Sequence, residues 1–344
     1  MAQVDIERLE PASSRLLPLA SHRLVALQVR HPELPRLAGV LRHAWADNLS
    51  RRHRLIPVLT QLDRAGIPHL LLKGAPLAFA TYPNPGARPM DDVDVLVPLA
   101  RGREALALLE GGGGSLLQTP LPAPPVDPSE PDPMLFKHGC ALQTASGLHL
   151  DLHWFALADC CQPGADDGFW ARRRPLPGAG TAWQPAPEDN FLHLCVHGMR
   201  ANPVHSIRWI ADTVLLLRVH DRTFDWALLL DEARRRRLVA PLRHAVDFLH
   251  AEFDAPVPSA WLEKIRAEPL SRLERAAHRG NVRSDFAGQF AATWLRYRRT
   301  SARLGALRAA AGFPTYLRHA WGHISLRRVF AHVLRRALRR GQKP

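Results

Sequence analysis

Two aspartates in one short apolar segment are the residues of this chain best suited to carry chemistry. Asp92 and Asp94 flank a valine in the segment DDVDVLV at residues 91–97. Alternate side chains of a β-strand point to the same side of a sheet, so these two carboxylates would lie together. Two adjacent like charges cost free energy unless a cation lies between them. The pair therefore predicts a divalent metal that handles phosphate groups, and hence chemistry on a nucleotide.

A third carboxylate is available on a later strand-like segment, HLDLHW at residues 149–154. Strand alternation places Asp151 and His153 on the polar side of this segment. Metal-dependent transfer to phosphorus needs a carboxylate on the ion that activates the acceptor. We therefore expect Asp92, Asp94 and Asp151 to bind Mg²⁺ or Mn²⁺, and Asp151 also to take the acceptor proton. Asp91 would turn away as a surface or capping carboxylate.

A lysine, a glycine and an arginine near the aspartate pair predict a phosphate-binding turn. Gly74 would let the backbone approach a phosphate, and a helix beginning at Ala75 would direct its N–H groups toward it. Lys73 and Arg88 would neutralise charge that builds on a leaving pyrophosphate. Only four of the 46 basic residues are lysines, which singles out Lys73. His153 would either orient a metal-bound water or substrate phosphate, or form a hydrogen bond beneath Trp154.

The elements that position these residues follow from hydrophobic periodicity. We expect helices over residues 1–66, followed by a strand at 69–73, a short helix at 75–82 and a strand at 93–97. A helix at 98–110, strands at 134–143 and 148–154, and helices from about 187 onward complete the expected elements. The fold class is therefore α+β: a small mixed-sheet core at 67–155, flanked by N-terminal helices (1–66) and a larger C-terminal helical region (156–344). Glycines and prolines at 112–133 predict a flexible insertion.

Composition excludes several classes of protein. The 344 residues contain 46% hydrophobic residues and no uncharged apolar run of 18, so a buried core is expected and a transmembrane helix is not. The four cysteines form no CxxC pair, and the N-terminus does not resemble a secretion signal, which favours a reduced, cytoplasmic setting. The net charge of +14 comes almost entirely from arginine, and part of it could serve an anionic partner.

Three segments carry a resemblance to a known family. LLKGAPLAFATYPNPGARPMDDVDVLV, HLDLHW and HLCVHG followed by RWIADTVLLL resemble the uncharacterised nucleotidyltransferases, within the superfamily of the polymerase-β type. The resemblance covers roughly residues 35–300. It implies a nucleotidyltransferase core at 67–155, an NTP donor, a divalent metal at Asp92, Asp94 and Asp151, and a gene often found beside peptide or polysaccharide biosynthesis genes. The superfamily's usual Gly-Ser turn is Lys73-Gly74 here.

The function expected from these residues is transfer of a nucleoside monophosphate, AMP, from ATP to a hydroxyl-type acceptor on a small molecule, peptide or protein. Two alternatives stay open on the same scaffold: a non-catalytic nucleotide-binding adaptor, and a kinase-like phosphoryl transferase. A basic nucleic-acid-binding protein is disfavoured, because the sequence has no aromatic stacking motif and no helix-turn-helix pattern.

Three further patterns have competing interpretations. Residues 326–340 predict a basic amphipathic helix, which would either pack on the body or lie against an anionic membrane. His193 and His197 stand four apart on a predicted helix, which suits either packing around a substrate pocket or a zinc site that lacks a third ligand. The glycines at 111–114 follow a helix, which indicates a hinge instead of a phosphate loop.

Overall fold

The structure is a computed structural model of the chain. It describes residues 8–118, 120–121, 123–124, 132–177, 180–200, 207–282, 286–301, 305–320, 325 and 327–331. The basic helix predicted at 326–340 falls largely outside these residues, as does part of the insertion predicted at 112–133. No helix within the described part of the chain is long and apolar enough to cross a membrane.

The N-terminal helices are α1 (Pro11–Ser14), α2 (Leu17–Ala26) and α3 (Leu34–Arg64). The long helix α3 buries a stripe at spacings of three and four residues, the pattern of a helix packed on a core: Leu55, Val58, Leu59 and Leu62. It ends before Gly66, whose φ of +63° is the left-handed conformation common just after a helix. The chain then enters the sheet at β1.

The sheet is mixed and has the strand order β3-β4-β5-β2-β1-β7-β6. Its strands are β1 (Leu70–Leu72), β2 (Val93–Leu96), β3 (Ser115–Leu116), β4 (Gly139–Gln143), β5 (His149–His153), β6 (Arg174–Pro175) and β7 (Trp183–Gln184). Strand β2 runs antiparallel to β1 and parallel to β5. The predicted α+β class with a mixed sheet is confirmed.

Two differences from the expected elements have local causes. Residues 134–136, predicted to begin a strand, form a 3₁₀ turn at Pro133–Phe136, where the side chain of Asp132 accepts a hydrogen bond from the Met134 N–H. Strands β6 and β7, at two residues each, are too short for alternation to reveal them, and they extend the sheet beyond residue 155. Strand β3 lies inside the predicted insertion.

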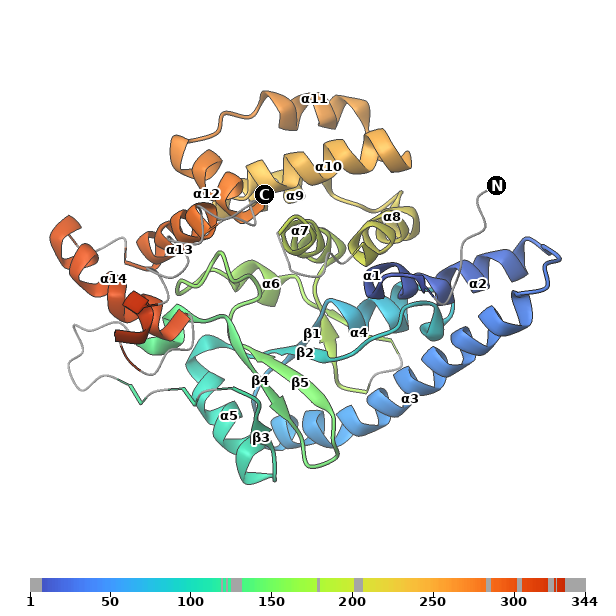
Figure 1. The fold of residues 1–344 in the computed structure, drawn as a ribbon, viewed down its shortest axis with the longest axis horizontal. Helices are drawn as coiled ribbons and strands as arrows, with labels where there is room; N and C mark the ends of the chain where they lie inside the picture. Colours follow the sequence, from blue (N-terminus) through green and yellow to red (C-terminus); the bar gives the residue numbers. More distant parts are fainter. Residues whose placement is uncertain are drawn as a thin grey trace.

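The two faces of the sheet have different surroundings. Val93 and Val95 of β2 and Leu152 of β5 join the main hydrophobic core, which includes residues of α3 and of α5 (Gly102–Gly111). The opposite face carries a smaller apolar cluster containing Leu72 and Leu96. Asp94 alternates with the valines and therefore lies on this second face. Figure 1 shows α3 and α5 on one side of the strands and the helices of the C-terminal half on the other.

The C-terminal half is helical, as expected. Its helices are α6 (Asp167–Ala171), α7 (Pro187–Gly198), α8 (Arg208–His220), α9 (Trp226–Arg236), α10 (Val239–Phe253), α11 (Ser259–Ala267), α12 (Arg272–Val282), α13 (Phe286–Thr300) and α14 (Ala306–Ala320). Helix α7 is buried along most of its length and packs between the sheet and α8–α10. Helices α13 and α14 lie apart from it and build a second, aromatic core with Phe136 (Figure 1).

Candidate active site

Strand register brings together two of the three predicted carboxylates. Asp94 of β2 is directly paired with Asp151 of β5 and with Leu72 of β1. Paired residues on neighbouring strands point to the same side of a sheet, so both carboxylates lie on the face opposite the main core. Oxygen atoms of Asp94 and Asp151 and a ring nitrogen of His153 all lie within 4.8 Å of one another. The three residues form one site with the chemistry of a metal-binding group.

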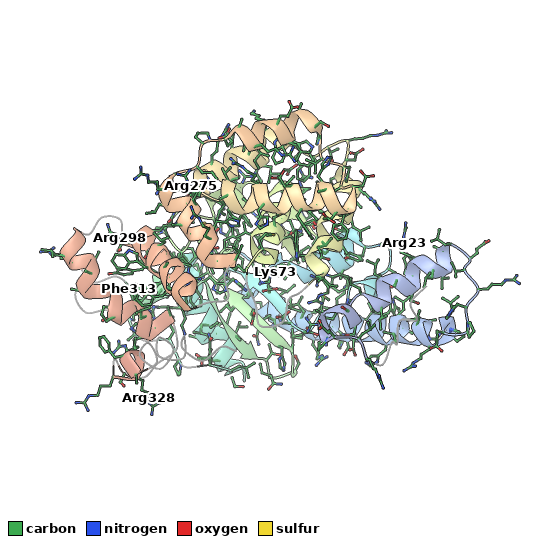
Figure 2. All side chains as sticks on the ribbon, turned by 45° about the horizontal axis from the view of Figure 1, so that its top comes forward. Arg23, Lys73, Arg275, Arg298, Phe313 and Arg328 are labelled. Carbon is green, nitrogen blue, oxygen red and sulfur yellow. The ribbon has the colours of Figure 1, made fainter. Side chains whose placement is uncertain are left out.

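Lys73 holds the buried carboxylate of this group. Its Nζ donates a hydrogen bond of 2.5 Å to Oδ1 of Asp94, and Nε2 of His153 lies 2.9 Å from the same oxygen. Burial alone would raise the pKa of Asp94, but Lys73 and then His153 outweigh it, so this pKa lies well below its ordinary value. Lys73 has φ +49°, a backbone conformation that is costly for a lysine and concentrates at functional sites. Figure 2 places Lys73 near the centre of the molecule.

The other two carboxylates are crowded by like charge. Burial, then Asp94, then Asp151 raise the pKa of Asp92, which lies at the exposed mouth of the site. Burial and then Asp94 raise the pKa of Asp151. A divalent cation would relieve this repulsion, and carboxylate oxygens are the ligands that Mg²⁺ prefers. The donor set therefore fits Mg²⁺, although Lys73 would have to yield its contact with Asp94. Asp91 instead forms an ion pair with Arg15.

Arg88 is placed beside the site by a second ion pair. Its Nε and Nη2 donate to the two carboxylate oxygens of Asp212 on α8, at 3.2 and 2.9 Å. The hydroxyl of Tyr82 donates to the same carboxylate at 2.8 Å. A Cβ on Gly74 would lie 2.6 Å from the guanidinium of Arg88, so a larger residue here would require Arg88 to shift from its contact with Asp212. The predicted phosphate-binding turn thus serves first to seat Arg88 against the start of the short helix α4 (Gly74–Pro76).

These side chains open onto one pocket of about 260 Å³. The pocket is lined by the predicted residues Lys73, Gly74, Arg88, Asp92 and Asp94, and by Asp91, Asp212, Arg15, His197 and Arg208 among others. Asp151 and His153 do not line the pocket, but both lie next to Asp94, which does. The pocket therefore brings together cations directly after β1, in the following loop and at the start of α8 with carboxylates at β2.

Arg208 is a pocket cation that the sequence did not single out. It donates a hydrogen bond to the carbonyl of Pro89, and no ion pair links it to a carboxylate in the described part of the chain. Burial, then Arg88 and Arg15, lower its pKa to about 10, so it still carries a charge at neutral pH. The only sequence signal was its place in RWIADTVLLL, which also contains Asp212.

The two helix histidines line a narrow cavity next to this pocket. His193, His197 and Lys73 contribute to its wall, and the rings of the two histidines are 6.5 Å apart. Neither histidine belongs to a group of three metal-ligating side chains in the described ranges. Burial, then Lys73, lower the pKa of His197 to about 3, so its imidazole is neutral. These observations favour the pocket-packing interpretation over zinc.

The site combines crowded carboxylates on two paired strands with cations that line the same pocket, an arrangement able to hold a metal–triphosphate complex. The model of a family described as uncharacterised nucleotidyltransferase matches residues 12–254. No curated protein matches the chain significantly. A solution structure of the antibiotic-resistance factor ANT(2'')-Ia is similar at 16% identity and a TM-score of 0.37, covering 59% of this chain and 97% of that one. That TM-score is too low to bear on the fold or the substrate.

Proposed function

Because the chain belongs to the family of uncharacterised nucleotidyltransferases, we propose that it transfers AMP from ATP to a hydroxyl group of an acceptor molecule. In this reaction the acceptor oxygen forms a bond to the α-phosphorus, and the bond between that phosphorus and the α–β bridging oxygen breaks. Pyrophosphate leaves, and the proton of the acceptor hydroxyl passes to a base of the protein. The acceptor itself is a small molecule, a peptide or a protein side chain.

One observation carries this proposal: the strand register pairs Asp94 with Asp151. Asp94 is in turn two residues along the chain from Asp92. Nucleotidyl transfer requires carboxylates on both the donor side and the acceptor side of the metal site. Asp92 and Asp94 line the pocket, whereas Asp151 lies behind Asp94 on the neighbouring strand. This asymmetry supports donor-side roles for the first two residues and an acceptor-side role for Asp151.

The pocket cations fit the triphosphate of the donor. Lys73, Arg88 and Arg208 line the same pocket as Asp92 and Asp94. Arg88 is held by Asp212 before a ligand arrives, whereas Lys73 would exchange its contact with Asp94 for a phosphate when Mg²⁺ binds. Arg208 has no such partner among the described residues, so it can give its full charge to a phosphate. Preorganised cations of this kind stabilise the charge that builds on the leaving pyrophosphate.

Asp92, Asp94 and Asp151, with His153 as a further candidate, would hold the metal ion. Bound Mg²⁺ would supply charge neutralisation at the phosphates and would lower the pKa of the acceptor hydroxyl. Asp151 would then accept the hydroxyl proton, since it lies on the acceptor side behind Asp94 and, unlike Asp94, has no side-chain cation in hydrogen-bonding contact among the described residues. His153 orients Asp94 through the hydrogen bond at Oδ1.

The donor site is tested by titrating the protein with ATP in the presence and absence of Mg²⁺ in a calorimeter. We expect Mg²⁺-dependent binding in the native protein and its loss in the double variant Asp92→Ala with Asp94→Ala. The matched control is Asp221→Ala with Asp231→Ala, two exposed aspartates away from the pocket. Equal Mg²⁺-dependent binding in the native protein and the site variant would refute the assignment of these ligands.

The reaction itself is tested by its products. Incubation of α-labelled ATP with extracts containing candidate acceptors should leave the label on the acceptor and release pyrophosphate. Release of ADP with transfer of the γ-phosphate would instead support the kinase-like alternative. Binding of Mg–ATP without turnover across the acceptors tested would favour the non-catalytic adaptor.

A further inference from the structure

A second, larger pocket of about 420 Å³ lies between the start of β4 and the helices α13 and α14. The sheet side is formed by Lys137 and His138, just before β4. The helical side is formed by Arg296 of α13 and Tyr316 of α14. These two helices begin at residue 286, beyond the end of the family match at residue 254. The helical side of this pocket therefore lies outside the matched region.

The large pocket and the candidate active site each share lining residues with the narrow histidine cavity. Lys73 and His197 line both the active-site pocket and that cavity. His138 and Arg200 line both the cavity and the large pocket. The ring of His138 lies 5.0 Å from the ring of His153, which contacts Asp94. The large pocket therefore lies next to the acceptor side of the metal site, with His138 between them.

The charges of the large pocket are unbalanced. Lys137, Arg200 and Arg296 line it, and no aspartate or glutamate does so among the residues that the structure describes. Arg200 is neutralised by a 2.6 Å hydrogen bond to Asp159, which lies outside the lining. Lys137 forms no ion pair within the described ranges, and burial lowers the pKa of its ammonium group. A half-buried cation without a counter-charge loses part of its hydration, and an anionic ligand would offset that cost.

Arg296 is the second cation available to a ligand. Its Nη2 donates to the hydroxyl of Thr293 at 3.2 Å, its Nε is buried without a hydrogen-bond partner, and no ion pair joins it to a carboxylate in the described part of the chain. Guanidinium groups bind carboxylate and phosphate oxygens in paired hydrogen bonds. Lys137 and Arg296 thus face the pocket from its two opposite walls.

The apolar part of the pocket is rigid and aromatic. Phe136 and Tyr316 contact each other edge to face, with ring centroids 5.1 Å apart. Both belong to the small aromatic core that α13 and α14 build with the 3₁₀ turn, which also contains Phe313, labelled in Figure 2. Aromatic walls with a few fixed polar groups are typical of small-molecule sites.

We propose that this pocket binds the acceptor substrate, that the acceptor carries an anionic phosphate or carboxylate group held by Lys137 and Arg296, and that α13 and α14 select it. The inference rests on the proposed nucleotidyl transfer, because it assigns the acceptor of that reaction. The anionic group lies in the large pocket, and the hydroxyl of the same molecule passes His138 toward Asp151.

The test uses inorganic phosphate and acetate as probes of the full-length protein, with the donor site filled by Mg²⁺ and α,β-methylene-ATP. We expect phosphate or acetate to bind, and Lys137→Gln and Arg296→Gln each to weaken that binding by about tenfold, as for loss of a charge-assisted hydrogen bond. The control is Arg308→Gln, an exposed arginine of α14 outside the pocket, which should change nothing. Tighter binding of phosphate indicates a phosphorylated acceptor, and tighter binding of acetate indicates a carboxylate.

Affinity of the probes that is unchanged in both Lys137→Gln and Arg296→Gln, or reduced equally in Arg308→Gln, would overturn the inference. Thermal unfolding and binding of the ATP analogue show whether each variant is folded. If Arg296→Gln unfolds, the result for Lys137→Gln decides, because Lys137 is a half-buried residue in a loop. A separate result would refute the proposed function: Mg²⁺-dependent ATP binding that is unchanged in the double variant Asp92→Ala with Asp94→Ala. In that case phosphate binding at Lys137 would define an anion site without an acceptor role, and the acceptor assignment would be overturned.

Discussion

This protein contains two clusters of charged side chains that differ in how their charges are compensated. The first, called the catalytic cluster for its proposed role, consists of Lys73, Asp92, Asp94, Asp151 and His153. The arginine cluster consists of Asp166, Arg172, Asp189, Glu232 and Arg236. The first opens onto a pocket and contains carboxylates that repel one another. In the second, each carboxylate contacts an arginine.

The contacts of the arginine cluster are those of a structural ion-pair network. Arg236 reaches Oδ1 of Asp166 at 3.0 Å and Oε2 of Glu232 at 3.1 Å, and Arg172 reaches Asp189 at 2.7 Å and Glu232 at 3.0 Å. Burial still raises the pKa values of Asp166 and Asp189. For Glu232, hydrogen bonds from Arg235 and Arg236 outweigh burial and lower the pKa to about 2.

The difference shows that buried charge alone does not mark a functional site. A network in which carboxylates and arginines alternate is already satisfied and has no need of a ligand. Beside the pocket, in contrast, neighbouring carboxylates add to burial in raising the pKa values of Asp92 and Asp151, and a bound cation would remove that repulsion. Substitutions in the catalytic cluster should therefore lower activity, and substitutions in the arginine cluster should lower stability.

The largest expected effect is on activity in the catalytic cluster. Asp151→Asn should lower the rate of pyrophosphate release by about 10² to 10⁴, the usual range for loss of a positioned proton acceptor. The free energy of unfolding in metal-free buffer should not fall, because the substitution removes a carboxylate whose charged form is disfavoured by burial and by Asp94. A variant that kept its transfer rate, or that lost stability in metal-free buffer, would break the comparison. Asp231→Asn, at an exposed position, is the control.

The second effect is on stability in the arginine cluster. Arg236→Met should lower the free energy of unfolding by about 3 to 5 kcal/mol, because it leaves Asp166 and Glu232 buried beside an apolar side chain. Urea unfolding measures this loss, and Arg222→Met at an exposed site should cause almost none. Binding of Mg–ATP per folded molecule should stay native; a selective loss of that binding would mean that the two clusters are coupled.

The smallest effect is a difference in pH dependence. The folded pKa of Glu232, about 2, lies below its ordinary value of 4.5, so the folded protein binds fewer protons at this residue than the unfolded chain does. Its contribution to stability is therefore present above about pH 4.5 and is lost as the pH falls toward 2. The stability difference between the native protein and Glu232→Gln, measured by urea unfolding, should shrink over this range. A difference that stays constant with pH would show that the carboxylate charge contributes nothing.

Much of the candidate site could be predicted because its chemistry is local in the sequence. Asp92 and Asp94 share a strand period, Lys73-Gly74 ends an apolar run, and Asp151 follows the alternation of β5. Arg208 could not be predicted, since its helix reaches the pocket only through packing of α8 against the loop that carries Arg88. Strands β6 and β7 were missed because pairing with β1, and not side-chain periodicity, defines such short segments.

By itself, the sequence determined the α+β class, the identity of the acidic strands, and the family whose match was later found over residues 12–254. These depend on periodicity and on motifs of a few residues, which short-range geometry sets. Only the tertiary structure decided that Lys73 contacts Asp94, that Asp212 fixes Arg88, and that α13 and α14 close a basic pocket next to the site. Each of these contacts joins residues that are 21 to more than 100 positions apart, and no local pattern encodes which distant side chain will arrive there.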